Sequence, residues 1–157
     1  MIIKDIVDFD IVNYKKPSLF IIFPHCSFKC DKENGNQYCQ NWSLNKLPDI
    51  TITAEDLIEK YYNHDILSAV VMGGLEPFDD FGCMVEFVSA FRKKYSDDIV
   101  IYSGYTEEEI ADKIELLKHY PNIIIKFGRY RPGQKPHRDE LLGVDLASDN
   151  QYAKRIS

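Results

Sequence analysis

Three of the four cysteines in this chain lie within residues 23–42, which read FPHCSFKCDKENGNQYCQNW. They are Cys26, Cys30 and Cys39, with the spacing C-x3-C-x8-C. The segment directly follows residues 18–23, which are apolar after the first residue and are predicted to form a buried strand. Thiolates grouped at the end of such a strand indicate chemistry rather than packing, and soft sulfur ligands suit zinc, copper(I) or an iron–sulfur cluster.

Two plainer interpretations of these cysteines stay open at this point. A structural zinc ion would need a fourth ligand, either His25 or Cys83, and zinc sites usually pair their ligands as C-x2-C or C-x4-C. Ordinary buried thiols are the other alternative. Because neither gap is of the paired kind, we favour an iron–sulfur cluster. Three ligands on a four-iron cube would leave one iron open to another molecule.

The composition limits the classes of protein that fit. A length of 157 residues predicts one domain, residues 1–157, large enough for its own core. Hydrophobic residues make up 45% of the chain, so a folded domain is expected rather than a disordered chain. The net charge of −6 argues against a nucleic acid or an anionic membrane as partner.

The first residues, MIIKDIVDFDIV, lack the basic and then apolar layout of a signal peptide, and no apolar run is long enough to span a bilayer. We therefore expect a cytoplasmic protein. In that compartment the four cysteines are expected to be reduced, as metal ligands or catalytic groups, rather than paired in disulfides.

Apolar strands alternate with amphipathic helices along the chain. Strands are predicted at residues 19–23, 66–72, 99–102 and 123–127. Helices are predicted between them, after capping signals at Thr53, at Asp79 or Asp80, and at Thr106. Residues 2–14 allow a short strand or hairpin. Residues 128–157 are predicted to be loops with room for one short strand or helix.

This β-α-β-α-β-α-β order predicts an α/β fold, with a parallel sheet flanked by helices. Right-handed crossovers would bring the carboxyl ends of the strands to one edge. That edge would receive the cysteine segment and the loops at residues 73–74, 103–104 and 128, and ligands bind at this edge in α/β folds. Periodicity alone allows either an open doubly wound sheet or part of a barrel.

The cysteine segment resembles the cluster loop of the radical S-adenosylmethionine (SAM) enzymes, whose usual pattern is C-x3-C-x-aromatic-C. The first spacing is kept, and Tyr38 occupies the aromatic position beside the cofactor. About six polar residues, 31–36, are inserted before the third cysteine. The resemblance implies that Cys26, Cys30 and Cys39 hold a [4Fe-4S] cluster whose fourth iron binds SAM.

A second segment, residues 72–77 with the sequence MGGLEP, resembles the GGEP motif of the same family, with Leu75 inserted. Glycines after a strand let the backbone approach a ligand closely. The resemblance implies that Gly73, Gly74 and Glu76 meet the amino group of SAM. Taken alone, the two glycines would fit any tight turn, and Glu76 would fit the start of a helix.

Two further segments resemble the small activating enzymes of anaerobic ribonucleotide reductases. The strand ending IVIYSGYT at residues 99–106 places Ser103 where it would face the SAM ribose, although a simple strand end and helix cap is the alternative. Lys126 lies in the apolar run of IKFGRY, residues 125–130, where it either extends to solvent or meets the SAM carboxylate. The segment ASDNQ near the end of the chain is also similar.

The resemblance implies the partial (β/α) barrel of the radical SAM type, because the chain is too short for eight units. It also implies an oxidoreductase that cleaves SAM reductively to a 5′-deoxyadenosyl radical, with no catalytic residue beyond the cluster ligands. The implied partners are a glycyl radical enzyme, an anaerobic ribonucleotide reductase, and an electron donor such as flavodoxin or ferredoxin.

Two alternatives to this activase stay open. One is a small radical SAM enzyme that acts on another peptide or small molecule. The other is a zinc-stabilised binding module without catalysis. Among the remaining residues, Cys83 is predicted to be a buried free thiol, and the basic group in residues 129–138 to be a solvated loop or a docking site for an acidic partner.

Overall fold

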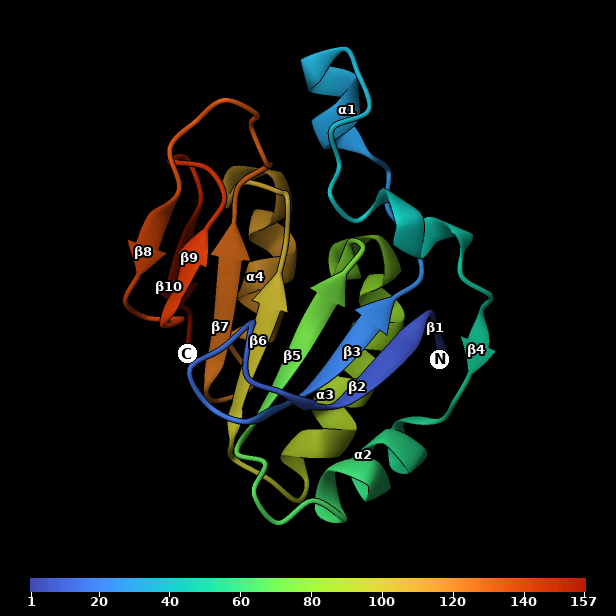
Figure 1. The fold of residues 1–157 in the computed structure, drawn as a ribbon. Coiled ribbons are helices and arrows are strands. Elements are labelled where there is room, and N and C mark those ends of the chain that lie inside the picture. The colour runs from blue at the N-terminus through green and yellow to red at the C-terminus, as the bar shows by residue number, and fades with distance from the viewer.

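A computed structural model describes residues 1–157 and contains a six-stranded sheet with the strand order β10-β7-β6-β5-β3-β2 (Figure 1). The strands are β2 (Asp5–Asp10), β3 (Ser18–Phe23), β5 (Ala69–Gly74), β6 (Asp98–Tyr102), β7 (Ile123–Phe127) and β10 (Tyr152–Arg155). Strands β3, β5, β6 and β7 are parallel, and β2 and β10 each add an antiparallel edge strand. The carboxyl ends of the four parallel strands therefore meet at one edge of the sheet.

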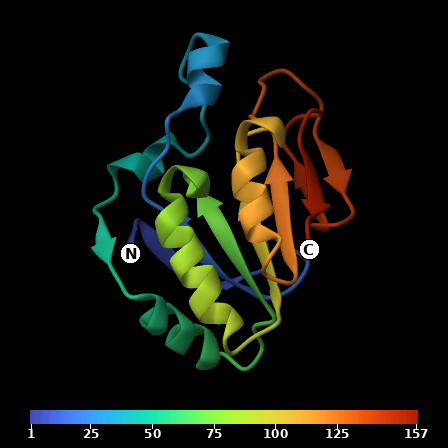
Figure 2. The ribbon, with the colours of Figure 1, turned by 180° about the vertical axis from the view of Figure 1, so that it is seen from behind.

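Three of the four helices cover one face of this sheet, as Figure 2 shows from behind, and the first helix projects beyond the carboxyl edge. The helices are α1 (Lys29–Asn34), α2 (Ala54–Tyr62), α3 (Phe81–Arg92) and α4 (Ala111–Leu117), with short 3₁₀ helices η1 (Trp42–Lys46), η2 (Pro77–Asp80) and η3 (Glu108–Ile110). Four short strands form two separate antiparallel pairs. One pair is β1 (Ile2–Ile3) with β4 (Ile50–Thr51), and the other is β8 (His137–Asp139) with β9 (Val144–Leu146). No helix combines the length and the apolar character needed to cross a membrane.

The larger core lies between the sheet and the helices. Met72 of β5 pairs with Ile21 of β3 and Ile101 of β6, so all three side chains point to the helix side and are buried. Helix α3 buries Phe87 and Phe91 against them at helical spacing. Helix α2 begins at the predicted capping box, in which the Thr53 hydroxyl accepts from the Asp56 amide at 3.0 Å.

The opposite face of the sheet is divided into two halves. Toward the amino ends of the parallel strands, Tyr14, Leu142 and Leu146 pack over Ala69, Val71, Val100 and Ile124 in a second, smaller core. Toward the carboxyl ends, the same face carries Phe20, Ile22, Tyr102 and Lys126, which line a cavity. The division leaves the carboxyl edge of the sheet open on this face.

The four predicted parallel strands and the shared edge are confirmed, except that the second strand runs from Ala69 to Gly74 and not from residue 66 to 72, and Ile66 is exposed. A doubly wound sheet is excluded, because the neighbouring parallel strands follow chain order and α2, α3 and α4 belong to the core on one face. The partial barrel stays a prediction.

Two details of the sequence analysis are wrong. Residues 128–157 contain three strands, β8, β9 and β10, where loops and at most one short strand or helix were predicted. The prediction failed because strands of three or four residues are too short for their alternation of polar and apolar side chains to stand out from loop sequence. The Asp80 side chain makes no capping hydrogen bond to α3, and the turn before that helix is capped by Glu76, which accepts from the Phe78 amide at 3.2 Å.

Candidate metal centre

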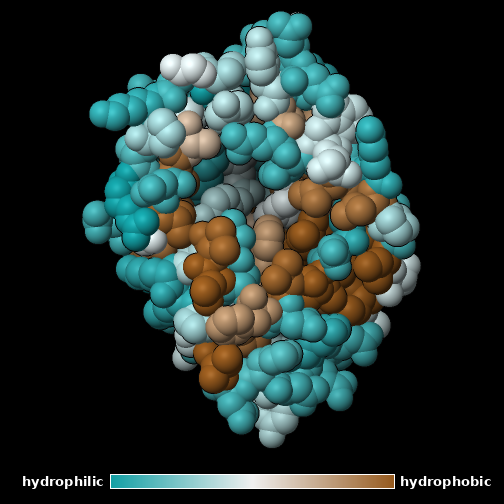
Figure 3. Space-filling view, in the orientation of Figure 1, coloured by the Kyte–Doolittle hydropathy of each residue, from teal (hydrophilic) through white to brown (hydrophobic).

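A cavity of about 500 Å³ opens at the carboxyl edge of the parallel strands, where Figure 3 shows a hollow in the visible face. Its volume lies within the range of roughly 300–1,000 Å³ that is typical of small-molecule sites. Helix α1 and the cysteine segment project beyond this edge (Figure 1). The cavity wall combines the cysteine segment with the ends of β5, β6 and β7, since it includes Cys26, Cys30, Cys39, Gly74, Glu76, Ser103, Gly104 and Lys126.

The three lining cysteines are free thiols and are half-buried. Burial raises the pKa of Cys26 to about 12 and also raises the pKa of Cys30 and Cys39. In the absence of metal they are therefore protonated, and binding a metal would release their protons. No three His, Cys, Asp or Glu side chains converge on one point that could hold a single ion. A four-iron cluster needs no such point, because each thiolate binds a different iron.

The turn between the first two cysteines depends on an unusual backbone conformation. Phe28 has a φ of 50°, in the left-handed region that non-glycine residues adopt at a cost of about 1–2 kcal/mol. Its amide donates to the Cys26 sulfur at 3.3 Å, and its ring lies 5.1 Å from that of Trp42. The aromatic contact offsets part of the strain, and the turn directs Cys26 and Cys30 toward the same cavity.

Glu76 is the carboxylate that joins the strand ends. Its side chain is 6% exposed and accepts hydrogen bonds from the Ser103 hydroxyl at 3.0 Å and the Gly104 amide at 2.8 Å, in addition to the Phe78 amide. Burial raises the pKa of Glu76 to about 7, and these hydrogen bonds oppose the rise. The end of β5 is thereby fixed to the turn after β6.

The glycines before Glu76 have different roles. Gly74 has a φ of 79°, and a Cβ there would lie 2.5 Å from Ile22, so the sharp turn requires glycine. Its carbonyl accepts from the Asn41 side chain at 2.6 Å, which ties the chain after the third cysteine to the end of β5. Gly73 lies in the sheet, where a Cβ would come within 3.1 Å of Tyr102.

Lys126 brings a buried cation to the same cavity. Its side chain is 7% exposed, and its ammonium donates to the carbonyl of Gly128 at 2.8 Å and more weakly to that of Ser103 at 3.4 Å. Burial lowers the pKa of Lys126 to about 8, while the negative charge of Glu76 opposes this change. Glu76 and Lys126 thus present opposite charges at the ends of two strands.

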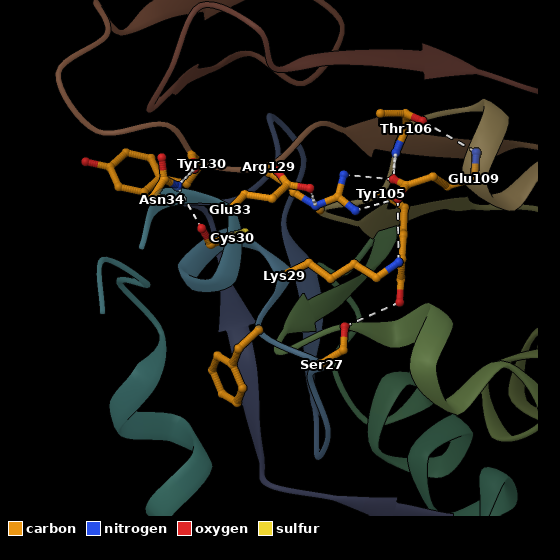
Figure 4. A network of polar contacts seen from close by, with 12 residues as sticks. Ser27, Lys29, Cys30, Glu33, Asn34, Tyr105, Thr106, Glu109, Arg129 and Tyr130 are labelled. Atoms are coloured by element: carbon orange, nitrogen blue, oxygen red, sulfur yellow. Dashed lines mark hydrogen bonds and ion pairs between the residues drawn. The ribbon is translucent and has the colours of Figure 1, made fainter. Parts of the chain in front are cut away.

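A polar network holds α1 against the loops that follow β6 and β7 (Figure 4). The Arg129 guanidinium binds both carboxylate oxygens of Glu109, and its Nε lies 3.2 Å from Glu33 of α1. Lys29 pairs with Glu109 at 3.5 Å and lies 4.5 Å from the centre of the Tyr105 ring. Arg129 holds the pKa of Glu109 down, to about 2.

The beginning of the cysteine segment is hydrogen-bonded to the residues that follow β5. The Asp79 carboxylate accepts from the Ser27 amide at 2.7 Å and from the Tyr105 hydroxyl. The Glu76 amide donates to the carbonyl of His25 at 2.7 Å. Residues 76–79 therefore fix the chain directly before and after the first cysteine.

A protein-family model described as a 4Fe-4S single cluster domain matches residues 17–151. The chain belongs to this family. Comparison with curated proteins gives no match. The matched range includes all three cysteines of the cavity, so this iron–sulfur protein has both the family and the thiol donors that a 4Fe-4S cluster requires.

Most of the site residues predicted from the sequence line the cavity of this 4Fe-4S domain. They are Cys26, Cys30, Cys39, Gly74, Glu76, Ser103 and Lys126.

Other residues singled out from the sequence do not line the cavity. Tyr38 lies outside the cavity wall and is 42% exposed, and Gly73 lies in the sheet beside Tyr102. His25 also lies outside the cavity wall and pairs with Asp80 at 2.6 Å. Cys83 of α3 is half-buried, which corrects the prediction of a buried thiol.

Sequence reasoning missed several residues that build the site. Asn41 binds the carbonyl of Gly74, and Asp31 accepts from the amides of Tyr38 and Cys39. Tyr102 lines the cavity and donates to the carbonyl of Asn13 at 2.6 Å. The position of Asp31 next to a cysteine was the only available signal, because the other contacts join segments distant in the sequence.

Replacing any of Cys26, Cys30 or Cys39 by alanine is expected to abolish retention of the 4Fe-4S cluster, because two thiolates cannot hold it. Iron and acid-labile sulfide, measured after anaerobic reconstitution, should fall to background while circular dichroism keeps the wild-type signal. The matched control is Cys83→Ala, which should retain wild-type iron because Cys83 lies outside the cavity. Iron loss in that control, or full iron in the other three variants, would contradict the ligand assignment.

Glu109→Gln is expected to destabilise the metal-free protein by roughly 1 kcal/mol at neutral pH, the upper range for partly exposed ion pairs. Because the pKa of Glu109 is lowered on folding from 4.5 to about 2, its contribution is present above 4.5 and is lost as the pH falls toward 2. Urea unfolding across this range should show the two proteins converge in stability. Glu115→Gln, in an exposed pair with Lys118, is the control and should change stability less.

Proposed function

We propose that this 4Fe-4S protein is a radical SAM enzyme, most specifically an activase that generates a glycyl radical on an anaerobic ribonucleotide reductase. The observation that carries the proposal is one cavity lined by three half-buried cysteines together with Glu76, Ser103 and Lys126. The resemblance of the C-x3-C spacing and of the MGGLEP and YSGYT segments to that family supports it.

The charges in the cavity suit a ligand that carries both an ammonium group and a carboxylate. Glu76 has a buried carboxylate at the end of β5, and Lys126 has a buried ammonium at the end of β7. A methionine-like zwitterion between them would have its amino group near the first and its carboxylate near the second. Ser103 donates to Glu76 at the cavity wall and would be close to the sugar of a bound nucleoside.

When bound, the reduced cluster would supply the electron that splits SAM into methionine and a 5′-deoxyadenosyl radical. The role of the chain is to bind SAM in one orientation and to exclude water. The apolar side chains of Phe20, Ile22 and Leu44 would do this on one wall. The hydrogen bonds of Glu76 to the turn after β6 would keep this part of the cavity wall in a fixed position.

The surface beside the cavity favours a polypeptide as the substrate. Val7, Phe9, Ile11 and Val12 are between 38% and 73% exposed, and Val12 also lines the cavity. Figure 3 shows hydrophobic residues beside the hollow on this face. Apolar surface that continues into a site is typical of protein–protein contacts. We therefore infer that a partner's loop carries the hydrogen atom that is abstracted, as in activation of a glycyl radical enzyme.

The direct test is anaerobic reconstitution with iron and sulfide, followed by dithionite reduction with and without SAM. We expect a reduced-cluster electron paramagnetic resonance signal that changes when SAM is added, and we expect 5′-deoxyadenosine and methionine as products. A reduced cluster whose signal is the same with and without SAM, and that yields no 5′-deoxyadenosine, would contradict the proposal. Protein that retains zinc and takes up no iron would contradict it as well.

Lys126→Met is expected to weaken SAM binding by about tenfold, because it removes a charged hydrogen-bond donor from the cavity. The Kd is measured from the SAM-dependent change in the electron paramagnetic resonance signal. Lys118→Met removes an exposed lysine that pairs with Glu115 and is the control. An unchanged Kd in Lys126→Met protein with wild-type iron would contradict a role of Lys126 in binding the SAM carboxylate.

A further inference from the structure

The eight-residue spacing between the second and third cysteines forms a closed loop. Helix α1 occupies the first four of these eight residues, 31–34, and Gly35, with a φ of 73°, ends the helix and turns the chain back. One carboxylate oxygen of Asp31 then accepts from the amides of both Tyr38 and Cys39, each at 2.8 Å. The residue directly after the second cysteine is thus bound to the backbone of the third.

We propose that Asp31 is a positioning residue for the cluster, whose carboxylate closes the long spacing and sets the place of Cys39 relative to Cys30. The proposal rests on the 4Fe-4S assignment and not on SAM cleavage. Because the Cys39 amide itself donates to Asp31, the contact constrains the backbone of the ligand directly. Hydrogen bonds to a carboxylate are stronger than those between neutral groups, so two of them suit this constraint.

The two halves of the loop between Cys30 and Cys39 are held differently, and only the second half depends on Asp31. The first half of the loop belongs to α1 and is held in two ways. Asn34 donates to the carbonyl of Cys30 at 2.7 Å within the helix, and Glu33 pairs with Arg129 in the segment after β7. Residues 36–38 are exposed, and Tyr38 is 42% exposed, so packing does little to fix the second half. The Asp31 carboxylate is therefore the contact that transmits the fixed position of α1 to Cys39.

The negative charge of Asp31 has a separate consequence. A carboxylate beside the cluster disfavours added negative charge, so it also disfavours the reduced form of the cluster. Position and charge can be separated experimentally, because an asparagine keeps an acceptor oxygen at this site and removes the charge.

The experiment compares Asp31→Ala and Asp31→Asn with wild type in the full-length, anaerobically reconstituted protein. We measure the rate at which iron is released to a chelator and the reduction potential by electron paramagnetic resonance titration. Asp31→Ala should release iron about tenfold faster, since it loses two charge-assisted hydrogen bonds. Asp31→Asn should release iron at close to the wild-type rate and shift the potential to a more positive value.

Asp112→Ala is the matched control, because Asp112 is an exposed aspartate on α4 and does not line the cavity. It should leave both the release rate and the potential unchanged. Wild-type release from Asp31→Ala would overturn the proposal, whereas an unshifted potential in Asp31→Asn would contradict only the separate effect of the Asp31 charge. Equal acceleration by Asp31→Ala and Asp112→Ala would also overturn it. Neither readout requires SAM, so failure of the SAM reaction would leave these outcomes interpretable.

Discussion

The site depends on the burial of one carboxylate. Glu76 is almost fully removed from solvent, and a buried carboxylate is tolerated only where hydrogen-bond donors surround it. The donors are the Phe78 amide, the Ser103 hydroxyl and the Gly104 amide, and they come from the segments that follow β5 and β6. Any displacement of one strand end would leave this group unsatisfied. The need to satisfy Glu76 therefore fixes the two loops on which the cavity is built.

The two faces of the sheet explain why the cavity lies where it does. Along β5 and β6, the buried residues that point to the helices are apolar and belong to the larger core. Residues on the other face change character along the strand, from Val100 near the middle of β6 to Tyr102 at its end, and β7 likewise passes from Ile124 to Lys126. Tyr14, Leu142 and Leu146 pack over the half of this face near the amino ends of the strands. In the other half, Tyr102 and Lys126 line the cavity together with the apolar Phe20 and Ile22 of β3.

The sequence predicted the strands well because each is a short apolar run, and it predicted α2 from the capping box at Thr53. The cysteines, Gly74, Glu76, Ser103 and Lys126 were found from motifs at strand ends, and all line the cavity. The contacts that hold them were not predictable. Arg129 was read as part of a basic loop, yet it is 8% exposed and bound to two carboxylates, because its partners lie in distant segments. Likewise, nothing local distinguishes Asp79, which binds Ser27, from an ordinary helix cap.

The charges around the cysteines are unequal, and Arg129 of the polar network in Figure 4 contributes to this difference. Carboxylates raise the pKa of Cys26 and Cys39, whereas Lys126 and Arg129 lower that of Cys30, although burial is the largest effect on all three thiols. Three thiolates on one cluster concentrate negative charge, which the low-dielectric cavity stabilises poorly without nearby cations. Arg129 supplies one of these cations while it binds Glu33 and Glu109, so the residue that anchors α1 also favours the thiolate of the cysteine within that helix. The guanidinium group that holds α1 therefore also contributes, together with Lys126, to the charge balance around Cys30.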